Sequence, residues 1–477
     1  MSSLLRDQPG FSDPWNDNPL SRAGLLDWVN AVLEEGFSRA SKYRKALLLV
    51  RERELEFEIP FEAIDSTIED VQFFGGSKGI FLGIGRAKEW EFHSEASLRT
   101  MKTALRLGDV SSCPSKTWLL GGWSFPPPRR LQRMKDGIWK DFPYSRWVVP
   151  ALLFTSANGR NHLILAAYFD PSTEGGLREY YGKLASTLTG LRKEARALPV
   201  PLRLNDLPSR KRWVSLARSA LESISKGKLK KVVLSRAMRI QFDGDIASFT
   251  VLKKLIESNP DSTVFAMKKG DTIFLGASPE QLLLLKNREI RVDCLAASAP
   301  RNSDREADES LGLNLIKEKK SRYEYQLVVQ GVKKSLAAMC SDIETPEKPL
   351  LKRLPNIQHL HSVIRGHLLP RVDVWSAALS LWPTPATGGE PQEHAVRWIQ
   401  DFEPLNRGWY SGVVGCVNAD GDGSLVVSIR SGLIRGRSAV LFAGSGIVSG
   451  SDPNREFEET DWKLATMMNA LAMKESK

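Results

Sequence analysis

The N-terminal part of the chain alternates short apolar runs with turn residues, a pattern that is typical of β-strands. Runs such as KALLLV, FFGGSKGIFLGIG and TWLLGGWSFPPP lie in residues 45–125, where glycine and proline separate them. The segments 145–155 and 162–169 predict a further pair of strands. Helices are predicted on either side of this region, within residues 1–40 and 176–195. The first of them follows a polar lead and carries its apolar residues near helical spacing: Leu25, Trp28, Val29, Val32 and Leu33.

A proline-rich segment, ALPVPLRLNDLPS at 197–209, is the best candidate for a linker. After it, the pattern predicts a helix at about 210–227 and then a strand, KKVVLSRAMRIQF, that begins at a lysine. From Asp261 onward, successive strands are separated by the turns KKGD and KNRE. A capping box formed by Ser303 and Glu306 then predicts the start of a long helix that runs to about Cys340.

Strand patterns return near the C-terminal end, at 409–417, 424–434 and 438–443. Both halves of the chain therefore place strands before helices. This order favours an α+β fold with layered sheets and helices over strict βαβ alternation. The 477 residues are enough for two to four ordinary domains or for one large unit.

The segment AGSGIVSGSDPNREFEETDWK, at 443–463, predicts a strand, a glycine loop and the start of a helix. Gly444, Gly446 and Gly450 would allow tight turns and a close approach of backbone amides to an anion. Ser451 or Asp452 can cap the helix, and Pro453 suits its first turn.

Three charged residues that follow the cap, Glu456, Glu459 and Lys463, share one helix face. Two carboxylates and an ammonium beside a glycine loop suit a metal ion and an acidic substrate. The alternative from spacing alone is an exposed helix with ordinary i,i+4 pairing.

Charge and composition narrow the expected partners. The net charge of +11 fits attraction of polyanions or steering of an anionic metabolite. The basic runs KGKLKK and KEKK are short and no nucleic-acid-binding motif accompanies them, so nucleic acid is not the expected partner. The four cysteines form no CxxC pair, and the histidines do not sit at zinc-ligand spacing with them. No apolar run approaches the roughly 20 residues that span a bilayer, and the polar start is unlike a signal segment. We therefore expect a soluble, cytoplasmic protein without a membrane partner.

Four polar residues lie where a strand or a helix would hold them rigidly. Lys231 begins a buried strand, where partial desolvation would make its amine usable as a base; a surface lysine is the alternative. Glu280 follows GASP at a strand end and is either a general acid or a turn residue in water. Glu324 can face the apolar side of the long helix and help to complete a hard-cation site. Arg430 lies inside SIRSGLI, where a buried guanidinium needs an anion such as a carboxylate.

Several motifs, in order along the chain, resemble those of chorismate-utilising enzymes: GASPE, PTPATGG, Tyr410-Ser411-Gly412, SIRSGLI and GSGIV…SDPNREFEETDWK. That family contains isochorismate synthases, salicylate synthases, anthranilate synthase large subunits and aminodeoxychorismate synthases. The resemblance covers about Leu204 to the end, so residues 204–477 would form the chorismate-binding catalytic region and 1–203 a variable N-terminal part of the same fold. It implies a large α+β sandwich of layered antiparallel sheets flanked by helices, with chorismate and Mg²⁺ bound in a cleft.

The resemblance also implies a role for each matching residue. Glu324 and Glu459 resemble the metal ligands, with Glu456 close by. Glu280 resembles the general acid at the C4 hydroxyl, and Lys231 the base that activates water. Seven further residues resemble those that bind the substrate's carboxylates and ring: Ser298, His359, Tyr410, Arg430, Gly444, Gly446 and Lys463.

Two positions distinguish the branches of the family. Lys231 resembles the water-activating lysine of isochorismate and salicylate synthases, and Ala296 stands where aminodeoxychorismate synthases often have a nucleophilic lysine. Water is then the expected nucleophile, added at C2 with loss of the C4 hydroxyl. The resemblance favours an isochorismate synthase of a menaquinone or siderophore route, acting as a monomer without an amidotransferase subunit. A salicylate synthase and an inactive chorismate-binding regulatory module remain the alternatives.

Four residues depart from the family pattern. Tyr325 replaces the histidine that follows the metal-binding glutamate, and Phe457 a common tryptophan. Ala297 replaces a loop glycine and Ser298 a threonine. Alanine in place of glycine is unfavourable only where the backbone needs a positive φ. No proposed acid, base or ligand is lost, so we expect activity.

Overall fold

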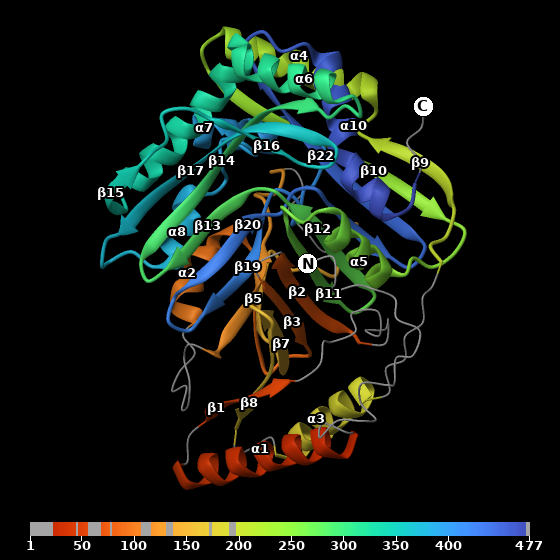
Figure 1. Ribbon diagram of the computed structural model, residues 1–477, viewed down its shortest axis with the longest axis vertical. Coiled ribbons are helices and arrows are strands. Elements are labelled where there is room, and N and C mark those ends of the chain that lie inside the picture. Colours follow the sequence, from red (N-terminus) through yellow and green to blue (C-terminus); the bar gives the residue numbers. More distant parts are fainter. Residues whose placement is uncertain are drawn as a thin grey trace.

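Two large antiparallel sheets form the body of the molecule, with helices packed around them (Figure 1). The structure is a computed structural model that describes residues 22–43, 46–55, 68–76, 79–105, 116–129, 137–170, 174–189 and 197–473. Each sheet contains strands from both sides of residue 203, so the two portions of the sequence build one layered fold. The predicted α+β class with layered antiparallel sheets is confirmed.

The larger sheet has twelve strands in the order β1-β8-β7-β3-β2-β11-β12-β21-β22-β10-β18, and β9 also pairs with β10. Neighbouring strands run antiparallel. Its strands are β1 (Leu47–Leu55), β2 (Asp70–Gly76), β3 (Gly79–Ile84), β7 (Leu152–Ala157), β8 (Arg160–Phe169), β9 (Pro201–Leu207), β10 (Lys231–Phe242), β11 (Thr263–Lys269), β12 (Thr272–Ser278), β18 (Gly389–Glu390), β21 (Ser431–Arg435) and β22 (Ser438–Val448).

The smaller sheet has ten strands in the order β15-β17-β14-β13-β20-β19-β5-β6-β4, and β16 also pairs with β17. These neighbours are antiparallel too. Its strands are β4 (Lys88–Phe92), β5 (Trp118–Trp123), β6 (Ser145–Val149), β13 (Gln281–Lys286), β14 (Glu289–Pro300), β15 (Cys340–Glu344), β16 (Leu350–Arg353), β17 (Ile357–Leu368), β19 (Val413–Asn418) and β20 (Gly423–Val427).

The helices divide between two apolar clusters. One cluster includes residues of α1, α3, α5 and α10 packed against the twelve-stranded sheet, and the other joins the two sheets with α4, α7, α8 and α9. The helices are α1 (Arg22–Tyr43), α2 (Glu95–Ala104), α3 (Glu174–Thr189), α4 (Arg210–Ser225), α5 (Ser248–Ser258), α6 (Arg305–Lys317), α7 (Lys319–Ala337), α8 (Val374–Leu381), α9 (Gln392–Phe402) and α10 (Pro453–Ala470). Across the described ranges, no helix is long and apolar enough to cross a membrane.

Aromatic side chains fill the space between the sheets. Trp139 stacks on Phe442 of β22 at 5.5 Å and meets Phe274 of β12 edge-on at 5.3 Å. On the smaller sheet, Trp123 of β5 lies 6.1 Å from Trp147 of β6. Burial of one such side chain stabilises the fold by roughly 1.5–3 kcal/mol. These side chains belong to the apolar cluster that includes strands of both sheets.

The structure confirms most predicted elements but divides several of them. The helix predicted within residues 1–40 is α1, and the strand predicted from Lys231 is β10. The segment 145–155 is not one strand, because Pro150 cannot continue a hydrogen-bond ladder; β6 before it joins the smaller sheet and β7 after it the larger. The polar lead and the end of the helix predicted at 176–195 lie outside the described residues.

The predicted linker is wrong, because residues 201–207 form the strand β9 along the outer part of β10. Prolines at positions 199, 201 and 208 suggested a break, but proline is tolerated at the ends of edge strands. The predicted capping box is also wrong, since Asp304, and not Ser303, accepts the hydrogen bond of the Ala307 amide. The long helix is two helices that meet at Glu318, whose backbone is extended.

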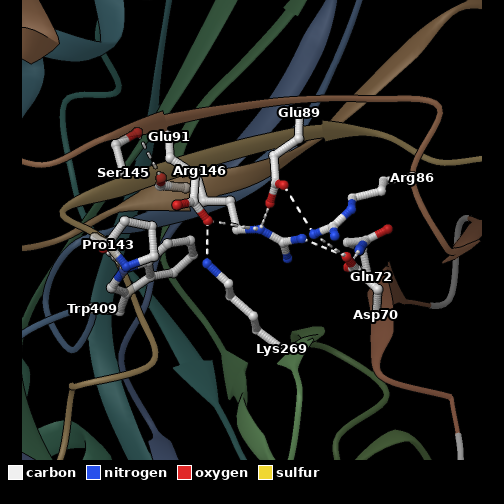
Figure 2. Close-up of polar contacts among 11 residues, drawn as sticks. Asp70, Gln72, Arg86, Glu89, Glu91, Pro143, Ser145, Arg146, Lys269 and Trp409 are labelled. Atoms are coloured by element: carbon white, nitrogen blue, oxygen red, sulfur yellow. Dashed lines mark hydrogen bonds and ion pairs between the residues drawn. The ribbon is translucent and has the colours of Figure 1, made fainter. Parts of the chain in front are cut away.

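A charged cluster links the two sheets on the side of β2, β4, β6 and β11 (Figure 2). Buried Arg146 of β6 contacts Asp70 of β2 at 2.6 Å and also pairs with Glu89 of β4. Lys269 of β11 pairs with Glu91 of β4, so cations and carboxylates alternate across the gap between the layers. A buried arginine of this kind must keep its partners, because removal of one member leaves an uncompensated charge.

Replacement of Arg146 by Met tests whether this cluster joins the sheets. We expect the free energy of unfolding to fall by about 3 kcal/mol, because Asp70 and Glu89 lose their buried partner. Urea unfolding followed by tryptophan fluorescence measures the change. Arg86→Met is the matched control: Arg86 contacts the same two carboxylates, but its side chain is 51% exposed, so a loss of less than about 1 kcal/mol is expected. Equal losses in the two variants would contradict the assignment.

Candidate active site

One pocket collects the chemical groups of both sheets where β10 and β22 approach β14, β17, α7 and α10, in the upper half of Figure 1. All of the residues predicted for the site line it, except Glu456. Sequence reasoning assigned no role to several other lining residues: Val233, Leu295, Ala386, Thr387, Ser411, Ile429, Phe442 and Ala443. Thr387 and Ser411 belong to motifs that the resemblance had already singled out, which was the available signal.

Lys231 and Glu324 form a buried ion pair between β10 and α7. Lys231 Nζ lies 2.8 Å from Glu324 Oε1, and the lysine side chain is only 1% exposed. An ammonium out of contact with water needs such a partner. The amine that was predicted as a base is therefore held at the pocket wall by a carboxylate that was predicted as a metal ligand.

Two of the glycines of the C-terminal motif lie in a strand and not in the predicted glycine loop. Gly444 and Gly446 lie inside strand β22, and of the three predicted glycines only Gly450 has a positive φ, +83°. Their role is the absence of a side chain. A Cβ at Gly446 would lie 2.5 Å from Glu324 Oε1 and 2.9 Å from Lys231 Cε. Glycine at this position of β22 therefore leaves room for the ion pair in its present arrangement.

Glu280 is the buried carboxyl on the side of β12 and β13. Its only side-chain hydrogen bond among the described residues comes from Thr384, whose Oγ1 donates to Glu280 Oε1 at 3.1 Å. Burial raises the pKa of Glu280 to about 7; the Thr384 hydrogen bond opposes this rise and the charge of Asp293 adds to it. A carboxyl with this pKa is partly protonated at neutral pH and can release its proton, as a general acid must.

His359 is a neutral, buried side chain that orients Arg430. Burial and the charges of Arg430 and Lys463 lower the pKa of His359 well below its usual value. Arg430 Nη2 donates to His359 Nε2 at 2.9 Å, so the ring proton lies on Nδ1. That nitrogen lies 3.1 Å from the carbonyl of Ala297 and 3.2 Å from Ser298 Oγ. The tautomer is thus fixed by its neighbours.

Arg430 offers a free donor to the pocket. Within the described part of the chain its Nη1 has no hydrogen-bond partner, although the residue is buried. Burial lowers the pKa of Arg430 to about 10, which still leaves the guanidinium charged at neutral pH. Tyr410, whose pKa burial raises, lines the same pocket as a neutral phenol. A buried guanidinium with an open donor is suited to a carboxylate.

Helix α10 presents its acidic residues to the pocket region. Asp452 caps the helix, as predicted, and accepts hydrogen bonds from the amides of Asn454 and Arg455. Lys463 Nζ contacts Glu459 Oε1 at 2.6 Å and donates to the carbonyl of Gly444 at 2.8 Å. Burial would raise the pKa of Glu459, but the charges of Lys463 and Lys320 and the hydrogen bonds from Lys463 and Ser298 together hold it below its usual value.

The three carboxylates predicted as metal ligands contact three different lysines. Besides the pairs already described, Glu456 contacts Lys320 at 2.5 Å and accepts from Ser445 Oγ at 2.6 Å. Burial would lower the pKa of Lys320, but Glu456, Glu324 and Glu459 together raise it. In the described ranges, no group of three or more His, Cys, Asp or Glu residues is arranged to hold a metal ion. The carboxylates lie close enough to act on one ammonium but are not gathered on a single point.

Three non-glycine residues that line the pocket have a left-handed backbone: Ala297 (φ 58°), Ser411 (φ 58°) and Arg430 (φ 52°). Ala297 is the extra residue of a bulge between β14 and β17, where the register shifts between Ala296 and Ser298. The strand predicted at 424–434 is divided into β20 and β21, and Arg430, with its left-handed backbone, lies between them. Such strain persists where the surrounding structure fixes the backbone, and it is common at functional sites.

The other departures from the family pattern lie outside the pocket. The hydroxyl of Tyr325 is 2.5 Å from Ser362 Oγ, and neither side chain lines the site. Phe457 packs edge-on to Trp213 at 5.6 Å and lies under the guanidinium of Arg236 at 4.2 Å. Both residues therefore support the scaffold behind the site.

Comparison with known proteins decides the family. The family described as "Chorismate binding enzyme" matches residues 52–472. The chain belongs to this family. This chorismate-binding enzyme is 34% identical over 358 residues to isochorismate synthase MenF of Bacillus subtilis, with 74% of each chain covered. It is 29% identical over 466 residues to the salicylate biosynthesis isochorismate synthase of Pseudomonas aeruginosa, with 95% of this chain and 96% of the other covered.

Solved structures share the fold of this chorismate-binding enzyme. The menaquinone-specific isochorismate synthase MenF of Escherichia coli superposes with a TM-score of 0.77 at 24% identity, over 93% of this chain and 99% of the other. The putative 2,3-dihydroxybenzoate-specific isochorismate synthase DhbC of Bacillus anthracis gives 0.70 at 25% identity, over 87% and 99% of the two chains.

Replacement of Gly446 by Ala tests the close packing beneath the ion pair. The new Cβ would overlap Glu324 Oε1, so we expect the free energy of unfolding to fall by about 1–3 kcal/mol and chorismate affinity to decrease. Urea unfolding and calorimetry measure the two effects. Gly182→Ala, in helix α3 with open space around it, is the control and should keep or slightly raise stability. Unchanged stability and affinity in Gly446→Ala would show that the packing is looser than the structure indicates.

Proposed function

We propose that the chain is an isochorismate synthase, which adds water at C2 of chorismate and expels the C4 hydroxyl. The observation that carries this proposal is the pairing of a buried lysine, Lys231, with a buried carboxyl of raised pKa, Glu280, in the walls of one pocket. Water addition with loss of a hydroxyl needs one group that takes a proton and one that gives a proton. Two relatives named isochorismate synthase, which align over most of the chain, support the same activity.

The two catalytic groups have opposite roles in proton transfer. Glu280 gives a proton: with its pKa of about 7, about half of the carboxyl is protonated at neutral pH and more of it at lower pH. Lys231 is the group that takes a proton from water, and its Nζ lies 2.8 Å from Glu324 Oε1. After the reaction Lys231 holds the proton taken from water and Glu280 has given its proton to the leaving hydroxyl.

The remaining lining residues suit the two carboxylates of chorismate. Arg430 Nη1 is open, and Tyr410 stands beside it as a neutral donor, so these two would hold the pyruvyl carboxylate. Ser298 of β14 would face the ring carboxylate, and Lys463 of α10 would belong to the same anion-binding region as Arg430 and Tyr410. His359 contributes by holding Arg430 in place.

Glu324, Glu456 and Glu459 would bind the Mg²⁺ ion that the family resemblance implies. The type of donor suits a hard cation, because carboxylate oxygens are the ligands that Mg²⁺ prefers. In the described ranges the three carboxylates are not gathered on one point, so they would have to converge to bind the ion. When bound, the ion supplies positive charge that neutralises a substrate carboxylate and helps to orient the ring. The protein must then release Glu324 from Lys231 and Glu456 from Lys320.

Product analysis tests the proposed reaction. Purified protein incubated with chorismate and Mg²⁺ should give isochorismate on chromatography, and EDTA should abolish it. We expect Lys231→Ala and Glu280→Gln each to lower kcat by about 10²–10⁴-fold, because each variant lacks one proton-transfer group. Lys230→Ala, the exposed neighbour of the same charge, is the control and should keep activity.

Two other results would assign a different function. Salicylate formed together with pyruvate would make the chain a salicylate synthase. Chorismate binding without any product would make it a regulatory module.

The pH dependence should report the proton on Glu280. Its pKa is raised to about 7, so the acid form is present below that pH and is lost as the pH rises through it. We expect kcat/KM to fall roughly tenfold per pH unit above about 7. In Glu280→Gln the residual rate should lose this fall, because the amide does not titrate. A fall near pH 7 that persists in the Gln variant would assign it to another group.

A further inference from the structure

The carboxyl of Glu280 is held from one side by a threonine to which the proposed mechanism assigns no role. Thr384 Oγ1 donates to Glu280 Oε1 at 3.1 Å, and the two residues are 2% and 3% exposed. Among the described residues no other side chain hydrogen-bonds this carboxyl. The two oxygens of the acid are therefore not equivalent: Oε1 faces a fixed donor and Oε2 does not.

A second hydroxyl lies within hydrogen-bond distance of the first. Thr387 Oγ1 lies 3.1 Å from Thr384 Oγ1. A threonine hydroxyl has one proton, so while Thr384 donates to Glu280 it can only accept from Thr387. The short chain Thr387–Thr384–Glu280 thus runs in one direction. With Oε1 accepting, the acid carries its proton on Oε2.

The loop that holds both threonines is anchored from behind. The carbonyl of Thr384 accepts from the amides of Thr387 at 3.0 Å and Gly388 at 2.8 Å. Arg407 Nη1 donates to the carbonyl of Thr387 at 2.9 Å, and the same guanidinium pairs with Glu403 at 2.6 Å, both side chains being 1% exposed. A fully buried ion pair of this kind is rigid, so the Thr384 hydroxyl has a fixed origin.

We propose that Thr384 is a positioning residue that binds one oxygen of Glu280 and so directs the transferable proton to the other oxygen, Oε2. The proposal rests on the proposed function, in which Glu280 protonates the leaving C4 hydroxyl. In each turnover the Oε2–H bond breaks, the proton goes to the departing hydroxyl, which leaves as water, and the carboxylate that remains keeps the Thr384 hydrogen bond. The same hydrogen bond steadies the charged form and limits how weak the acid becomes.

Other charged groups also act on Glu280, and they stay in place when Thr384 is changed. Asp293 of β14 favours the protonated form, whereas Lys231 of β10 and Lys352 of β16 favour the ionised form. Arg430, between β20 and β21, is the fourth charged neighbour. A change confined to Thr384 therefore isolates the hydrogen bond from these charges.

The test compares Thr384→Val, which removes the hydroxyl at nearly constant shape, with Thr384→Ser, which restores it. In Thr384→Val the fall of kcat/KM should move up by about one pH unit, because the ionised form loses a hydrogen bond. At pH 6, where the carboxyl is protonated in every variant, kcat should fall about tenfold with little change in KM, because the proton is no longer confined to Oε2. Thr384→Ser should recover both properties.

A second readout does not depend on turnover. Carbon-13 NMR of protein labelled in its glutamate carboxyls, with the Glu280 signal assigned by Glu280→Gln, should show the same upward shift of its titration in Thr384→Val. If the wild-type chain makes no product, the proposed function fails while this titration still tests the hydrogen bond.

Thr272→Val is the matched control, because Thr272 is a fully buried threonine that donates to another carboxylate, Asp141, at 2.6 Å outside the pocket. It loses the same kind of hydrogen bond and should leave the pH profile and the Glu280 titration unchanged. An unshifted profile in Thr384→Val, or a serine variant as impaired as the valine variant, would overturn the proposal.

Discussion

The ion pair between Lys231 and Glu324 is the interaction on which the rest of the site depends. A buried ammonium and carboxylate are tolerable only together, so strand β10 and helix α7 must meet at this point. Gly446 of the neighbouring strand β22 leaves room for this ion pair, because a Cβ there would lie 2.5 Å from Glu324 Oε1. The three elements come from separate parts of the sequence: β10 and β22 are neighbouring strands of the larger sheet, and α7 packs on β14 of the smaller one. The pocket is therefore lined by residues of both sheets and of helices α7 and α10.

Buried charges recur where layers meet, and each is enclosed by partners. Arg407 pairs with Glu403 and also donates to the carbonyls of Thr387 and Val233, which ties the loop after α8 to β10. Arg146 does the same for the opposite side of the sandwich. Replacement of such pairs by well-packed apolar residues is often neutral or stabilising, so their value lies in specifying one arrangement of the layers. In this chain that arrangement is the one that brings the two proton-transfer groups together.

The sequence predicted the residues of the site better than the secondary structure of the segments that connect them. Motifs identified Lys231, Glu280 and Arg430, and the structure collects all three in one pocket. Spacing alone does not show whether a glycine is needed for a turn or for close packing without a side chain. The loop predicted around Gly446 is therefore wrong, because this residue lies inside strand β22. Thr384 stood in a recognised motif without a role, because its partner is 104 residues away and no local pattern reports such a contact.

Ala297 shows how a departure from the family pattern can be absorbed. Its φ of 58° is the left-handed conformation that glycine adopts freely and that costs alanine about 1–2 kcal/mol. The bulge between β14 and β17 imposes this conformation, and the Ala297 carbonyl then accepts from His359 Nδ1 at 3.1 Å. That contact fixes the tautomer in which Nε2 accepts from Arg430, so Arg430 Nη1 is left open to the pocket. The hydrogen bonds that orient Arg430 toward a carboxylate thus also hold Ala297 in its strained conformation. The methyl group alters the cost of the bulge and leaves the direction of these bonds unchanged.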